Sequence, residues 1–191
     1  MQLQFVFAVN KNSTFNHFFM TIQEVQQAMV TSLAAYSDAL VTELQQLLTQ
    51  LHFDFDVGCG SKDVYGLFFE YDLDSFKILC YPFDREANSI ANAKHLLSQT
   101  KDKELFPQDI EANFYATLEK ARVDDDTIEQ VSNELFTYQI TIFEKWFAEA
   151  WCNAKKQANM TSMKGFLAFY GNIWYYDLDQ QEYIREDEIV G

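Results

Sequence analysis

Residues 21–51 read TIQEVQQAMVTSLAAYSDALVTELQQLLTQL, and this stretch contributes most to the predicted fold. Thr21 and Glu24 match the T-x-x-E capping box, in which two side chains bond free backbone N–H groups at a helix start. Apolar residues then recur at steps of three and four, and no Gly or Pro interrupts them. They are Ile22, Val25, Met29, Leu33, Tyr36, Leu40, Leu44, Leu47 and Leu51. The pattern predicts one amphipathic helix of about 30 residues, roughly 45 Å long, with a nearly straight apolar stripe.

A second long helix is predicted after the acidic triplet at residues 124–126. We expect Asp126 to cap it, with Glu129 three residues later, and Lys155 and Lys156 to lie near its C-terminus. Its predicted buried stripe is Ile128, Val131, Leu135, Tyr138, Ile142 and Trp146, widened by Phe143, Phe147 and Trp151. Shorter helices are predicted over residues 86–99 and 107–122.

Strand patterns occur at the start, in the middle and at the end of the chain. They cover residues 2–9, 63–71, 76–83, 164–170, 173–178 and 182–185. Gly171-Asn172 is typical of a two-residue hairpin loop. The two middle runs are apolar at nearly every position, which predicts a hairpin covered on both faces. The elements together predict one α+β domain over residues 1–191. In it, an antiparallel sheet of N-terminal strand, central hairpin and C-terminal meander packs against two long amphipathic helices and the shorter ones.

Composition excludes several classes of protein. The 191 residues include 14 Lys and Arg against 29 Asp and Glu, for a net charge of −15, and 48% are apolar. Such a chain has enough apolar residues to form a core, so it is not intrinsically disordered. Its negative field repels nucleic acids, and it lacks the basic clusters that bind anionic membranes. The odd number of cysteines, 3, and the lack of an apolar run long enough to span a bilayer favour a cytoplasmic protein.

A repeated tetrapeptide is the strongest candidate for metal chemistry. Residues 71–74 and 176–179 both read Y-D-L-D, and each lies where a predicted strand meets a turn. If the two turns met, their carboxylates would suit a hard cation. One alternative function is therefore a metal-assisted hydrolase that uses Glu70, Asp72, Asp74, Asp177 and Asp179. Aspartate is also common in turns, because its side chain bonds its own backbone, and the chain has no G-x-S-x-G, P-loop or H-E-x-x-H motif. We therefore predict no enzyme, no metal and no cofactor.

The C-terminal segment combines acidic with aromatic residues. Residues 177–188 hold six acids against a single base, Arg185, for a local charge of −5. Trp174, Tyr175 and Tyr176 are consecutive in a predicted strand, so their rings cannot all lie on one face, and an exposed ring is a suitable interface anchor. Acids beside exposed rings favour the capture of a basic protein through electrostatic steering. The predicted partner contacts are Trp174, Tyr176, Asp177, Asp179, Glu182, Glu186 and Asp187.

In size, acidity and aromatic-rich α+β layout, the chain resembles the immunity proteins of bacterial polymorphic toxin systems, including those of contact-dependent growth inhibition. The sequence that carries the resemblance is GFLAFY at residues 165–170, followed by IWYYDL at 173–178. Such proteins bind a cognate toxin and block its active site, and many of these toxins are basic nucleases. The resemblance implies a non-enzymatic antidote to a basic protein partner. The other alternative is a structural protein that self-associates through its long helices. The oligomeric state and the binding face stay open.

Overall fold

The computed structural model describes residues 21–73, 77–98, 106 and 108–189. Its helices within these ranges are α1 (Ile22–Ala34), α2 (Ser37–Gln50), α3 (Gln108–Lys120) and α4 (Asp125–Ala158). The strands there are β1 (Gly66–Asp72), β2 (Lys77–Phe83), β3 (Lys94–Leu96), β4 (Lys164–Phe169), β5 (Trp174–Asp177) and β6 (Glu182–Arg185). Two short 3₁₀ helices in these ranges are η1 (Ser61–Asp63) and η3 (Glu186–Glu188). The predicted strand at residues 2–9 lies outside the described residues.

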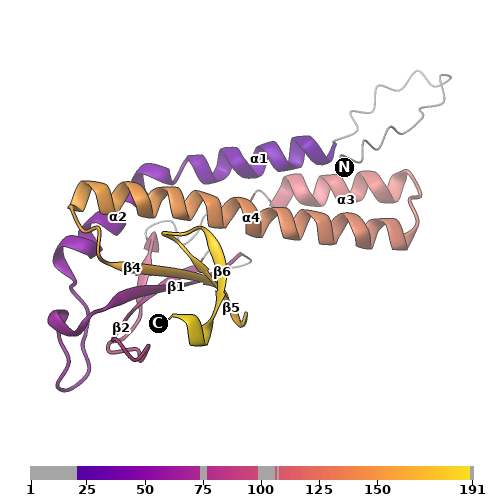
Figure 1. The fold of residues 1–191 in the computed structure, drawn as a ribbon. Coiled ribbons are helices and arrows are strands. Elements are labelled where there is room, and N and C mark those ends of the chain that lie inside the picture. The colour runs from indigo at the N-terminus through magenta and orange to yellow at the C-terminus, as the bar shows by residue number, and fades with distance from the viewer. Residues whose placement is uncertain (1–20, 74–76, 99–105, 107, 190–191) are drawn as a thin grey trace.

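In the described chain the strands form one six-stranded sheet with the order β3-β2-β1-β4-β5-β6. The fold is α+β, as predicted, but the sheet is mixed, because the central strands β1 and β4 are parallel, with Gly66 opposite Lys164. Figure 1 shows the reason: α2 and α4 both finish at the same end of the molecule, so the chain enters β1 and β4 from that end. The predicted central hairpin and C-terminal meander are confirmed as antiparallel pairs.

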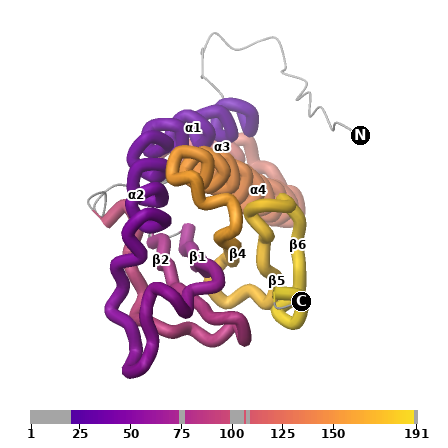
Figure 2. The backbone as a smooth tube through the Cα atoms, turned by 60° about the vertical axis from the view of Figure 1, so that its left-hand side comes forward, coloured from indigo at the N-terminus to yellow at the C-terminus, as the bar shows by residue number. Residues whose placement is uncertain are grey.

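The helices lie together on one side of the sheet, and Figure 2 shows this two-layer arrangement. Alternate residues of β1 face the helices. Phe69 packs its ring against Phe147 and Trp151 of α4, with centroids 4.9 and 5.6 Å apart. Tyr71 stacks on Phe143 at 4.2 Å. Each fully buried side chain of this kind stabilises the fold by roughly 1.5–3 kcal/mol, so α4 and β1 form the centre of the core.

The predicted helix over residues 21–51 is in fact two helices. The capping box at Thr21 is present, but the chain turns at Ala35 and Tyr36, where the Tyr36 N–H donates to Leu33. The indole Nε1 of Trp146 donates to Ser37 Oγ at 2.9 Å, immediately after the turn. The apolar spacing continues across the break, with Leu33 and Leu40 both buried, and periodicity therefore gave no sign of it.

Helix α4 begins earlier than predicted and buries a rotated stripe. Asp124, not Asp126, is the N-cap, and its carboxylate accepts the N–H of Thr127 at 2.9 Å. Within the predicted stripe, Leu135 and Trp146 are buried. The remaining predicted positions, Ile128, Val131, Tyr138 and Ile142, are only partly buried, whereas Phe143, Phe147 and Trp151 are fully buried. The buried stripe differs from the predicted one because the second half of α4 packs against the sheet in addition to packing against α2.

The predicted helix over residues 86–99 is wrong. The carboxylate of Asp84 accepts the N–H groups of Glu86 and Asn88, each at 2.9 Å, and this local turn competes with a helix. The chain then pairs with β2 as the edge strand β3. The helix predicted over residues 107–122 is confirmed as α3. Among the described helices, none has the length and apolarity needed to cross a bilayer.

Candidate partner-binding surface

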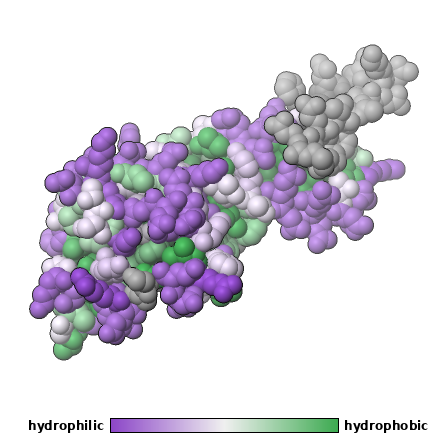
Figure 3. Space-filling model, in the orientation of Figure 1, coloured by the Kyte–Doolittle hydropathy of each residue, from purple (hydrophilic) through white to green (hydrophobic). Residues whose placement is uncertain are grey.

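Large apolar side chains are exposed around the C-terminal meander. They are Tyr170, Ile173, Trp174 and Tyr183, with 66%, 76%, 40% and 51% of their surface accessible, and we call them the meander patch. They come from the β4–β5 turn and from the neighbouring strands β5 and β6. Figure 3 shows apolar residues emerging among polar ones over the sheet layer. Trp174 and Tyr183 lie on the face of the meander toward the helices, since the Tyr183 hydroxyl bonds Glu144 of α4, whereas Tyr170 lies beside Glu70 on the other face. Exposed rings on adjacent strands and their turn mark a contact surface more strongly than scattered apolar residues do.

Acidic residues adjoin the meander patch along the chain, in β6 and in η3, which follows it. Glu182, Glu186 and Asp187, which the sequence predicted as partner contacts, are exposed, and so is Glu188. Within the described part of the chain, the single salt bridge lies elsewhere, so none of these acids is paired with a base there. The local base, Arg185, lies over the ring of Trp174 at 5.4 Å from its centroid. This cation–π contact orients the indole, and Arg185 forms no salt bridge with Glu182, Glu186 or Asp187. The Glu188 carboxylate accepts the backbone N–H of Arg185 at 2.7 Å.

Three other predicted contacts have structural roles. Tyr176 and Asp177 are 7% and 3% exposed. The Asp177 carboxylate accepts the N–H groups of Asp179 and Gln180 at 2.8 and 2.9 Å, which fixes the β5–β6 turn. Asp179 in turn accepts a hydrogen bond from the Lys155 ammonium at 2.6 Å. These two carboxylates are therefore engaged within the chain, and we do not assign them to the patch.

The Asp179 contact joins the meander to the end of α4. Besides Lys155, the indole Nε1 of Trp151 donates to Asp179 Oδ1 at 3.2 Å. The Lys155 ammonium also donates to the carbonyl of Met163 at 2.7 Å, just before β4. The Lys155 and Asp179 side chains are only 10% and 26% exposed. The bridge thus holds β4, the β5–β6 turn and α4 together.

The two Y-D-L-D turns lie at opposite ends of the sheet. Tyr71 is opposite Phe169 at the end of β4, whereas Asp177 is opposite Phe166 near its start. Asp74 lies outside the described residues, and the rest of the described chain contains no group of three His, Cys, Asp or Glu that could hold a metal ion. The convergence that the hydrolase alternative requires is therefore not found in this part of the chain.

Tyr71, the first residue of the Y-D-L-D segment at residues 71–74, belongs to a buried polar cluster that the sequence analysis did not predict. Glu144 of α4 is 5% exposed and accepts hydrogen bonds from the Tyr71 hydroxyl at 3.3 Å and the Tyr183 hydroxyl at 2.5 Å. Burial raises the pKa of Glu144, and the two hydroxyls offset this in part. Burial and the nearby carboxylate raise the pKa of Tyr71 and Tyr183 as well. The cluster connects α4 to β1 and β6.

The face of the sheet away from the helices is covered only in part, unlike the prediction for the central hairpin. Phe83 and Phe166 are buried there together with Ile189, but Phe68 and Tyr81 remain partly exposed. Between these covered and exposed residues lies a hollow of about 290 Å³, which we call the aromatic hollow. Its lining includes Phe68, Glu70, Tyr81, Phe83, Tyr175 and Glu186.

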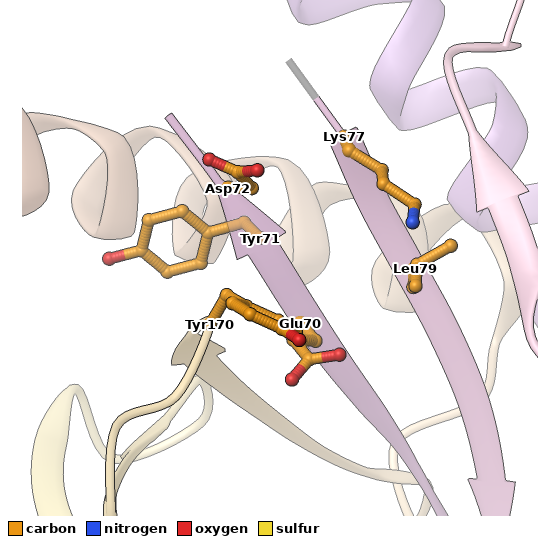
Figure 4. Close-up of a pocket in the computed structure, with 6 residues that line it drawn as sticks. All are labelled: Glu70, Tyr71, Asp72, Lys77, Leu79 and Tyr170. Carbon is orange, nitrogen blue, oxygen red and sulfur yellow. The ribbon is translucent and has the colours of Figure 1, made fainter. Parts of the chain in front are cut away.

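A smaller depression of about 170 Å³ lies on the other side of Glu70, lined by Asp72, Lys77, Leu79 and Tyr170. Figure 4 shows Glu70 beside the ring of Tyr170, with Lys77 on the neighbouring strand. The alternation of Phe68, Glu70 and Asp72 with the buried Leu67, Phe69 and Tyr71 was the sequence signal that separated the two faces of β1. This alternation was hard to recognise in the sequence, because the predicted strands at residues 63–71 and 76–83 are apolar at nearly every position.

Comparison of the chain with protein-family models, curated proteins and solved structures finds no match.

Proposed function

We propose that the chain is an acidic, non-enzymatic binding protein that captures a basic protein partner and occludes it, as an immunity protein does with its toxin. The observation that carries the proposal is the meander patch together with the exposed acids Glu182, Glu186 and Asp187 of the adjoining segments β6 and η3. Trp and Tyr are frequent energetic anchors at protein interfaces, and acids at the rim accelerate the encounter with a basic protein.

The position of these acids favours a binding role over a structural one. Acids on the helical layer include Asp124, which caps α4, and Glu24, which completes the capping box of α1. Glu182 and Glu186 lie on the edge strand and on the short 3₁₀ helix that follows it. At physiological salt the Debye length is about 8 Å, so the acids that attract a partner are those at the surface it contacts.

The helical layer gives less support to self-association. The apolar stripes that motivated that alternative are buried within the chain, where α2 packs on α4 and α1 packs on both α3 and α4. Val25, Met29, Leu40 and Leu44 are 1% exposed or less. Sedimentation of the full chain tests the alternative directly, because it requires a stable second copy.

The test of the proposal is a calorimetric titration of the full chain with the basic toxin domains encoded by its neighbouring reading frames. We expect one such domain to bind, with an affinity that falls as salt rises. Trp174→Ala is expected to weaken binding at least tenfold, because it removes the indole of the patch, and Trp is a frequent anchor at interfaces. Val30→Ala is the matched control, since Val30 is exposed to the same 40% but lies on α1. Absence of binding by every basic domain at low salt would reject the proposal.

A further inference from the structure

We infer that the aromatic hollow binds the guanidinium group of an arginine side chain presented by the basic partner, with Glu70 as its counter-ion. The inference rests on the proposed function and adds a chemically defined contact on the sheet face away from the helices, to which Glu186 also belongs. It is carried by the position of a carboxylate among aromatic rings.

Three strands bring the rings of the hollow together. Phe68 of β1 is opposite Tyr81 of β2, with ring centroids 6.4 Å apart, and its other neighbour is Tyr175 of β5 at 5.0 Å. The Tyr81 hydroxyl donates to Glu70 Oε2 at 3.4 Å, which holds that carboxylate against the rings. The arrangement therefore combines ring faces and a negative group in one concave site.

The hollow contains two negative groups and attracts a cation. Glu70 enters it from β1, and Glu186 enters it from η3. Both carboxylates raise the pKa of Tyr175 beyond the effect of its burial, which places the two negative charges close to one ring. Lys77 lines the smaller depression, which Glu70 also lines, and no base in the described ranges forms a salt bridge with Glu70 or Glu186.

The chemistry of the hollow favours arginine over other cations. A cation within about 6 Å of an aromatic centroid is attracted to the ring face, and the planar guanidinium both stacks on rings and forms paired hydrogen bonds with a carboxylate. An ammonium is more strongly hydrated and loses more on leaving water. The volume, about 290 Å³, lies at the lower limit of small-molecule pockets, which suits a single side chain rather than a larger ligand.

The experiment is an NMR titration of the isotopically labelled full chain with N-acetyl-arginine-N-methylamide. We expect saturable shifts at Phe68, Glu70, Tyr81 and Tyr175. The lysine analogue should bind more weakly, and the uncharged citrulline analogue should give no shifts. Glu70→Gln keeps the shape of the side chain and is expected to weaken binding about tenfold or more. Glu186→Gln, on the exposed η3, is a second variant that leaves the sheet intact, whereas Glu134→Gln on α4 is the charge-matched control.

The outcomes separate this inference from the proposed function. If the arginine probe leaves the hollow unshifted, or binds the Glu70→Gln and Glu186→Gln variants as well as the unchanged chain, the inference is overturned even where a basic domain binds. If the probe binds the hollow in a Glu70-dependent manner but no basic domain binds, the guanidinium site stands and the proposed function fails. Binding of the citrulline analogue with equal affinity would also contradict the inference, since it would show that charge is irrelevant.

Discussion

Replacing Asp179 with alanine tests whether this residue fixes the C-terminal meander to α4 rather than serving as a partner contact. The change removes the acceptor of two hydrogen bonds, from the Lys155 ammonium at 2.6 Å and from the Trp151 indole at 3.2 Å. It leaves the ammonium, on a side chain only 10% exposed, with the Met163 carbonyl as its remaining acceptor. A charged group that is nearly buried and has lost its counter-ion is costly.

The expected loss of unfolding free energy is about 3 kcal/mol. Breaking a fully buried ion pair costs about 3–5 kcal/mol, and exposure of 26% of the Asp179 side chain moves the expectation to the lower end of that range. In a chain of this size, each kcal/mol lowers the melting temperature by roughly 2–4 °C, so the expected decrease is about 6–12 °C.

Urea denaturation followed by far-UV circular dichroism measures the loss. The midpoint should fall while the slope of free energy against urea stays constant, because the surface exposed on unfolding is unchanged. Glu149→Ala is the control on the same helix, where Glu149 is exposed, and a change below about 0.5 kcal/mol is expected. A loss below about 1 kcal/mol for Asp179→Ala would refute the reasoning, because a solvent-exposed salt bridge contributes no more than that to stability.

Two further changes test the packing of the sheet and the buried carboxylate. Gly165→Ala is expected to lower the unfolding free energy by about 1–3 kcal/mol in urea, because its Cβ would lie 2.6 Å from the Trp151 ring, whereas Gly60→Ala, with no atom within 4 Å, should be nearly neutral. Glu144→Gln is expected to remove a pH dependence of stability. Because burial raises the pKa of Glu144 in the folded state, the folded chain binds a proton there more tightly than the unfolded chain does. Protonation of Glu144 therefore adds to the free energy of unfolding at low pH, and this contribution is lost as pH rises from about 4.5 through the folded-state pKa. The stability of the unchanged chain relative to the variant should therefore fall as pH rises; a rise would contradict this sign.

Local patterns predicted the elements whose residues interact with near neighbours in the chain. The capping box at Thr21 is present, and the steps of three and four identified buried residues such as Leu33 and Leu40. Alternation along the strand correctly separated the rings of β5, because Tyr175 packs on Phe68 while Tyr176 lies with Tyr183. These predictions succeeded because side-chain direction follows from backbone period alone.

Contacts between distant segments account for the errors. The break after Ala34 is next to a hydrogen bond from Trp146 to Ser37, 109 positions away, which no local pattern contains. The parallel pairing of β1 with β4 depends on where two helices end rather than on either strand's composition. In the same way, the acidic run gave no sign that Asp179 is paired with Lys155.

The central claim is that local negative charge beside the meander patch, rather than net charge, captures the partner. The decisive measurement is the affinity for the basic partner domain of two variants with the same net charge. One carries Gln or Asn in place of Glu182 and Asp187, which do not line the aromatic hollow, and the other carries Gln in place of the exposed helical acids Glu129 and Glu134. The account predicts at least tenfold weaker binding and a shallower salt dependence for the first variant only. Equal affinities for the two variants would contradict it.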